Sequence, residues 1–93
     1  MGNLLTEKNV TLMQREILLF AAIRDAAETD SLVIDVPSDA TADDVLREVA
    51  ERIPSTQSLL ASCRVALDNR YVANTQLLGA AKEIAIIPPV SGG

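Results

Sequence analysis

The sequence predicts a single α+β domain in which one main helix lies across one face of a mixed sheet of four or five strands. The chain has 93 residues, of which 48% are hydrophobic and 23% charged, and this composition suits one hydrophobic core rather than a disordered chain. The predicted elements follow the order strand, strand, helix, strand, strand, strand. We therefore expect one domain at residues 15–93, preceded by a flexible extension at residues 1–14.

The first two predicted strands form a hairpin. Residues 15–22 are an apolar run with a charged start, too short for a typical helix, which favours a strand buried on both faces. Residues 23–29 carry charges among alanines and predict a short helical turn. Residues 31–36 are rich in β-branched side chains and alternate in polarity, and Pro37 ends this second strand.

The clearest helix spans residues 41–53. The Thr41 hydroxyl can cap the free N–H groups of the first turn, and Asp43 and Asp44 are favourably placed near the positive end of the helix dipole. Charged residues occupy the opposite face and indicate a solvated surface rather than a site. The apolar positions fall on one stripe that faces the core, formed by Val45, Leu46, Val49, Ala50 and Ile53.

The second half of the chain predicts three more strands. Pro54 ends the main helix, and Ser55 is a candidate cap for a shorter helical segment that reaches Cys63. Residues 64–68 alternate like a strand, and a tight turn at Asn69-Arg70 leads into the return strand at residues 71–73. The last strand, residues 83–87, is apolar on both faces.

One helix cannot cover both faces of such a sheet, so an uncovered apolar patch is expected, and such patches usually mark a partner surface. Two sets of side chains alternate along the first and last strands, and the period does not decide which set faces the helix. The first set is Ile17, Leu19, Ile84 and Ile86, and the second is Leu18, Phe20, Ala85 and Ile87.

Composition excludes several classes of function. Acidic residues outnumber basic residues by 13 to 8, which argues against a nucleic-acid partner. The chain has no His and one Cys, so zinc centres and His-based catalysis are not expected, and we predict no metal site. Cys63 is expected to be a small buried side chain. No apolar run is long enough to span a bilayer, so we predict no membrane partner and a cytoplasmic location.

The last six residues, PPVSGG, combine a stiff stem with a slim tip. Pro88 and Pro89 cannot donate hydrogen bonds to a strand and hold the backbone extended, whereas Gly92 and Gly93 carry no side chains. Such a segment can enter a narrow channel of a partner and present a terminal carboxylate there.

This ending, directly after an Ile-Ile strand, resembles that of the molybdopterin synthase small subunits, a family of sulfur carriers with the ubiquitin-like β-grasp fold. The resemblance covers residues 15–93. It includes the strand ILLFAAIRD with Phe20 and Arg24, the helix after TADDV, the hairpin VALDNRYV and the end EIAIIPPVSGG.

The resemblance implies a carrier rather than an enzyme in its own right. An ATP-dependent activating enzyme would adenylate the carboxylate of Gly93, sulfur would replace AMP to give a thiocarboxylate, and the large subunit would use it to convert precursor Z into molybdopterin. No cofactor would be bound permanently, and AMP would be attached only transiently. The residues expected to contact partners are Phe20, Arg24, Ile87, Pro88, Pro89, Val90, Ser91 and Gly92. Alternatives are a related carrier for thiamin or tRNA thiolation, and a ubiquitin-like protein modifier.

Overall fold

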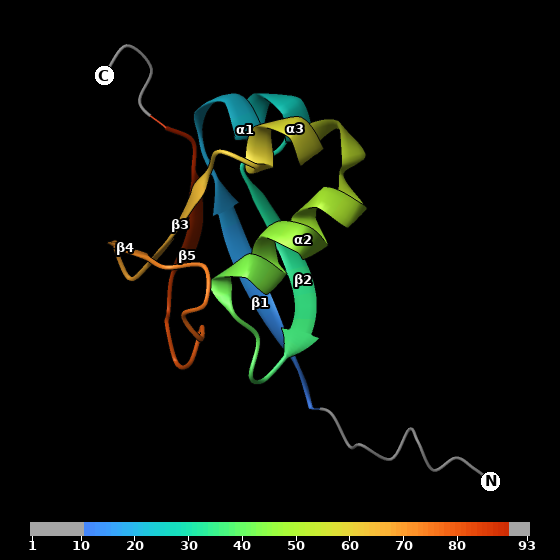
Figure 1. Cartoon of the computed structure of the whole chain (residues 1–93). Coiled ribbons are helices and arrows are strands. Elements are labelled where there is room, and N and C mark those ends of the chain that lie inside the picture. The colour runs from blue at the N-terminus through green and yellow to red at the C-terminus, as the bar shows by residue number, and fades with distance from the viewer. Residues whose placement is uncertain (1–10, 90–93) are drawn as a thin grey trace, which may run out of the picture.

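The computed structural model describes residues 11–89, in which five strands form one mixed sheet with the order β2-β1-β5-β3-β4 (Figure 1). The neighbours β1 and β5 are parallel, and the other neighbouring pairs are antiparallel. The predicted α+β class and mixed sheet are confirmed. The strands are β1 (Leu12–Leu19), β2 (Ser31–Pro37), β3 (Arg64–Leu67), β4 (Arg70–Val72) and β5 (Ile84–Ile87).

The first strand of the hairpin begins earlier and ends earlier than the sequence predicts. Strand β1 starts at Leu12, three residues before the predicted domain boundary, because Leu12 pairs with Pro37 and Met13 with Val36. Residues 1–10 of the predicted extension lie outside the described residues. The strand ends at Leu19. Ala21 and Ala22, which the sequence predicts in the strand, belong to helix α1 (Ala21–Ala27). The chain turns there because Ala21 has a left-handed backbone, with φ 51°.

Helix α2 (Ala42–Arg52) lies within the predicted range of the main helix and starts with a capping box. The Thr41 hydroxyl accepts a hydrogen bond from the backbone N–H of Asp44 at 3.3 Å, and the Asp44 carboxylate accepts one from the N–H of Thr41 at 2.9 Å. This backbone hydrogen bond is the main cause that lowers the pKa of Asp44 below its ordinary value. The N-cap prediction is confirmed.

The predicted stripe of α2 faces the sheet. Val45 and Val49 are fully buried and Leu46 is almost so, while Ala50 is half-buried. Figure 1 shows the helix lying across β1 and β2. The opposite face is solvated as predicted, with ion pairs that join Asp43 to Arg47 at 3.8 Å and Glu48 to Arg52 at 3.3 Å.

Two short segments follow α2, the 3₁₀ helix η2 (Pro54–Thr56) and helix α3 (Gln57–Leu60). The prediction that Ser55 caps this segment is wrong. Its hydroxyl instead donates to the carbonyl of Ala26 in α1 at 3.2 Å, because η2 packs against α1. The segments therefore close one end of the core together with α1, whose Ile23 is fully buried.

The β3–β4 hairpin turns at Asp68 and Asn69, one residue before the predicted turn. Both residues have left-handed φ values, 50° and 69°, which is the geometry of the type I′ turns that match the twist of a two-residue hairpin. The Asp68 carboxylate accepts hydrogen bonds from the N–H groups of Lys82 and Glu83, each at 2.9 Å. The turn is thereby attached to the segment that leads into β5.

The long connection between β4 and β5 is held by an arginine from β1. The Arg15 guanidinium donates to the carbonyl oxygens of Gly79 at 3.2 Å and Ala81 at 3.0 Å. Leu78 of the same connection is buried in the core. These contacts fix where β5 begins, and β5 is the strand that continues toward the C-terminal segment.

Candidate functional site

The helices cover the face of the sheet to which β1 and β5 contribute Ile17, Leu19, Ile84 and Ile86. These four side chains are at most 2% exposed. Because side chains alternate along a strand, the second set projects from the other face, which we call the open face. The structure thus decides the question that the period leaves open.

The strand register arranges the open face in two rows. One row runs across four strands, through Leu18 of β1, Ala85 of β5, Ala66 of β3 and Tyr71 of β4. In the second row Ile87 of β5 lies opposite Arg64 of β3. Phe20, just beyond the end of β1, lines the same depression as Ile87. The predicted uncovered apolar patch is therefore present, with Phe20 42% and Tyr71 55% exposed.

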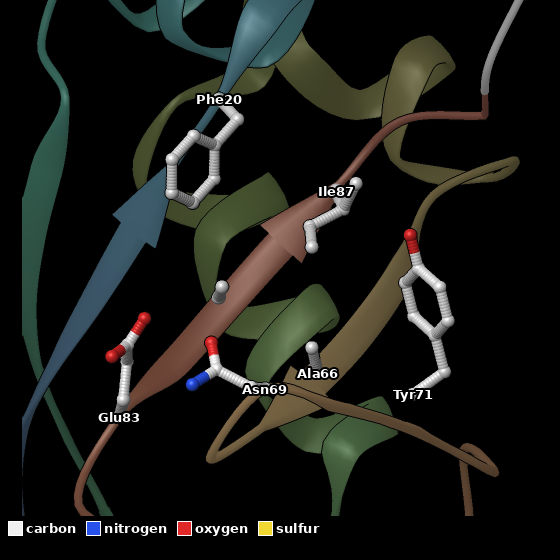
Figure 2. A pocket seen from close by; sticks show the side chains of 7 residues that line it. Phe20, Ala66, Asn69, Tyr71, Glu83 and Ile87 are labelled. Atoms are coloured by element: carbon white, nitrogen blue, oxygen red, sulfur yellow. The ribbon is translucent and has the colours of Figure 1, made fainter.

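A shallow depression lies at the centre of this face (Figure 2). Two of its lining residues, Ala66 and Ala85, are small and only 5% and 4% exposed, and the other lining side chains are larger. Its volume of about 220 Å³ is below the roughly 300–1,000 Å³ typical of small-molecule pockets. The depression suits side chains of a protein partner. Its other lining residues are Phe20, Asn69, Tyr71, Glu83 and Ile87.

The structure brings the predicted contacts Phe20 and Ile87 together at the end of β5 from which the chain continues (Figure 2). Arg24 lies on α1 and lines an adjoining depression with Phe20, while forming a 3.8 Å ion pair with Asp25. Pro88 is half-buried and Pro89 exposed. Four predicted residues, Val90, Ser91, Gly92 and Gly93, lie outside the described residues.

Sequence reasoning missed the contribution of β3 and β4 to this face. Tyr71 and Arg64 stand at its far side, with the Arg64 guanidinium carbon 4.9 Å from the centre of the Tyr71 ring. The alternation of Arg64, Val65 and Ala66 was visible in the sequence. The face to which each residue belongs depends on pairing with β5, which no local pattern gives.

Cys63 is buried, as predicted, and lies at a groove on the helical side. Burial raises the pKa of its thiol, and the Sγ atom lies 3.2 Å from the carbonyl oxygen of Leu59. A raised pKa keeps the thiol protonated at neutral pH and opposes nucleophilic chemistry.

Within residues 11–89, no group of three or more His, Cys, Asp or Glu side chains is placed to hold a metal ion. Over the same residues, no helix has the length and apolar character needed to cross a membrane.

Comparison with known proteins shows the family of the chain. Residues 17–93 match the ThiS family. The molybdopterin synthase sulfur carrier subunit of Dictyostelium discoideum is 37% identical over 83 residues, which cover 86% of this chain and 96% of that protein. The protein of the same name from Arabidopsis thaliana is 32% identical over 78 residues, covering 84% of this chain and 81% of its own length.

Solved structures confirm the β-grasp fold. The small archaeal modifier protein 1 of Haloferax volcanii has a TM-score of 0.73 and 27% identity, covering 83% of this chain and 98% of its own. A protein–protein complex of subunits 1 and 2 of the molybdopterin-converting factor from Helicobacter pylori contains a chain with a TM-score of 0.60. That chain is 22% identical, covers 87% of this chain and is matched over 100% of its own length, and it shows the shared fold.

Proposed function

Because this chain belongs to the ThiS family and is a sulfur carrier subunit of molybdopterin synthase, we propose that the carboxylate of Gly93 is the group that carries the sulfur. The family match that extends to residue 93 supports this assignment. The open face then serves to dock the carrier on the proteins that act on this carboxylate.

The chemistry requires activation, because a terminal carboxylate with a pKa of about 3.3–3.7 is ionised at neutral pH and is a poor electrophile. An activating enzyme would transfer AMP from ATP to the carboxylate and release pyrophosphate. A sulfur nucleophile at the oxidation level of sulfide would then attack the carbonyl carbon, and AMP would leave. The product is a thiocarboxylate, which would supply sulfur to precursor Z in the active site of the large subunit. The carrier needs no cofactor of its own for these steps.

The observation that carries the proposal is the continuity of the open face with the strand that leads to the tail. Ile87 is the last residue of β5 and also part of the open face, and Pro88 follows it directly. A partner seated on this face is therefore placed beside the point where the tail leaves the domain. We propose that Phe20, Arg24 and Ile87 contact the large subunit on the domain surface. The tail contacts would be Pro88, Pro89, Val90 and Ser91, with Gly92 giving the slim tip.

We propose that the activation of the carboxylate and the transfer of sulfur take place in the cytoplasm. The one cysteine, Cys63, is a free buried thiol, which fits a reducing compartment.

Two changes at the tail test the role of Gly93. Deletion of Gly92 and Gly93 is expected to leave the thermal unfolding curve unchanged and to abolish molybdopterin formation. One residue added after Gly93 should act similarly, because it displaces the reacting carbon by about 3.3 Å, and errors of 1 Å can cost on the order of 100-fold in rate.

The matched control for the extension is a chain lengthened by one alanine at its N-terminus. Molybdopterin is measured after incubation with the large subunit, activating enzyme, ATP, a sulfur source and precursor Z. Intact mass should show one oxygen replaced by sulfur in the wild-type chain. Full activity of either tail variant would overturn the assignment of Gly93.

The likeness to the small archaeal modifier protein 1 favours a second candidate function, attachment of Gly93 to lysine side chains of other proteins. The two functions share an activated carboxylate and differ in its acceptor. Chain isolated from its own cells distinguishes them. A carrier is recovered intact with a sulfur-for-oxygen mass change, whereas a modifier yields branched peptides that end in Gly-Gly on target lysines.

A further inference from the structure

We propose that Arg64, supported by the ring of Tyr71, determines specificity on the open face by binding a carboxylate of the large subunit. This inference rests on the proposed function, because it identifies the chemistry that the docking partner must present. The two residues lie beside Ile87 on the open face.

Arg64 lies on the open face beside Ile87, the residue after which the C-terminal segment begins. In the β3–β5 register Arg64 lies directly opposite Ile87, so the two residues are on the same face of neighbouring strands, which are roughly 4.8 Å apart. Pro88 follows Ile87, and the Arg64 side chain is exposed. Any protein that covers Ile87 and receives the tail also meets this guanidinium.

The contact with Tyr71 holds the guanidinium in a defined place. Its central carbon lies 4.9 Å from the ring centre, within the range of a cation–π interaction. A planar guanidinium stacked in this way keeps its N–H edge free, and that edge matches the two oxygens of a carboxylate. Because the side chain is already ordered, less conformational entropy is lost when a partner binds.

Arg64 differs from most arginines of the chain in having no hydrogen-bond or ion-pair partner within residues 11–89, where its contact is the Tyr71 ring. Four arginines bind carbonyl or carboxylate oxygens of the domain itself: Arg15, Arg24, Arg47 and Arg52. Arg64 and Arg70 make no hydrogen bond or ion pair with the described residues. The chain has a formal net charge of -5, so the Arg64 guanidinium is a local positive charge on an acidic protein. Without a hydrogen-bond or ion-pair partner among the described residues, it favours a partner surface that is locally acidic.

Arg70 is a matched control from the same hairpin. It pairs with Leu67, whose side chain is buried on the helical side, so Arg70 projects away from the open face. The two arginines thus share strand context, charge and exposure, and differ in the face that they occupy.

The test measures the Kd of the complex with the large subunit by calorimetry, at low and at high salt. Arg64→Glu is expected to raise Kd on the order of 10- to 100-fold, since it replaces an attraction with a repulsion between like charges. Arg64→Lys keeps the charge and loses the planar fork, so its Kd should lie between those of the wild type and Arg64→Glu. Arg70→Glu should change Kd less than about twofold.

Reversal of one acidic residue of the large subunit to lysine should restore the affinity of Arg64→Glu and weaken the wild-type complex. Equal effects of Arg64→Glu and Arg70→Glu at both salt concentrations would overturn this inference. If that equality is found while Phe20→Lys raises Kd, docking through the open face stands and only the role of Arg64 is lost. No binding by the folded wild-type chain would overturn the docking proposal and this inference together.

Discussion

The two faces of the sheet carry similar apolar side chains from the same two central strands and meet different surroundings. On the covered face these are Ile17, Leu19, Ile84 and Ile86, and on the open face they are Leu18, Phe20, Ala85 and Ile87. The covered face packs against the helices and provides the hydrophobic stabilisation of the fold. No helix of the described domain packs on the open face, where Phe20 is 42% and Tyr71 55% exposed, although the small side chains of Ala66 and Ala85 are only 5% and 4% exposed. An exposed apolar face of this kind is typical of a surface that binds a protein partner, as proposed above.

Two neighbouring isoleucines on β5, Ile86 and Ile87, test whether the two faces differ in their contribution to stability. Ile86→Ala should destabilise the domain by roughly 2–5 kcal/mol, because it leaves a cavity beneath the helices. Ile87→Ala should cost less than about 1 kcal/mol in unfolding free energy, since its side chain is only half-buried on the open face. Urea unfolding measures both values, and similar losses of stability would show that the two faces do not differ as described.

Phe20 tests the open face for binding. Phe20→Lys should leave stability nearly unchanged, because the side chain is 42% exposed. It should raise the Kd for the large subunit on the order of 10- to 100-fold, because a lysine cannot be desolvated at low cost where the aromatic ring was. Leu77→Lys is the control, since Leu77 is 52% exposed and lies beside the start of α2. Calorimetry that finds Kd unchanged in the folded Phe20 variant would remove this residue from the interface.

The smallest expected effect concerns the N-terminal cap of α2, the helix that packs on the covered face. Asp44→Ala should lower stability by about 1 kcal/mol at pH 7 through loss of the hydrogen bond to the N–H of Thr41. Affinity for the large subunit should not change. Asp43→Ala, in the same helical turn, should cost only a few tenths of a kcal/mol.

The difference between wild type and Asp44→Ala should also depend on pH. The pKa of Asp44 is lower in the folded protein than its ordinary value of 3.8. Its contribution is therefore complete above pH 3.8 and is lost as the pH falls through the folded value. Thermal unfolding from pH 7 to pH 2 measures this, and a difference that stays constant to pH 2 would contradict the role of the ionised carboxylate.

Local chemistry was sufficient to predict much of the fold. The capping residues and apolar stripe of α2 identify that helix, and Pro37 and Pro54 lie where the strand and helix end. The β3–β4 turn was misplaced by one residue because Asp68, like Asn69, tolerates a left-handed backbone. The start of β1 at Leu12 was missed because pairing with β2, rather than local hydrophobicity, sets it.

Four features could be predicted without the structure: the α+β class, the main helix, the presence of an uncovered apolar patch and the resemblance carried by the last six residues. Each of these depends on composition, on spacing along the chain or on a short motif. Which side of each central strand faces the helices, and which side is open, became clear only from the packing of the folded domain. The structure also brings Arg64 and Tyr71, both of the β3–β4 hairpin, beside Ile87, which comes much later in the sequence. The physical reason is that side chains alternate between the two faces of a strand with a period of two, and this period does not show which face is buried. The packing of α2 against one face determines that.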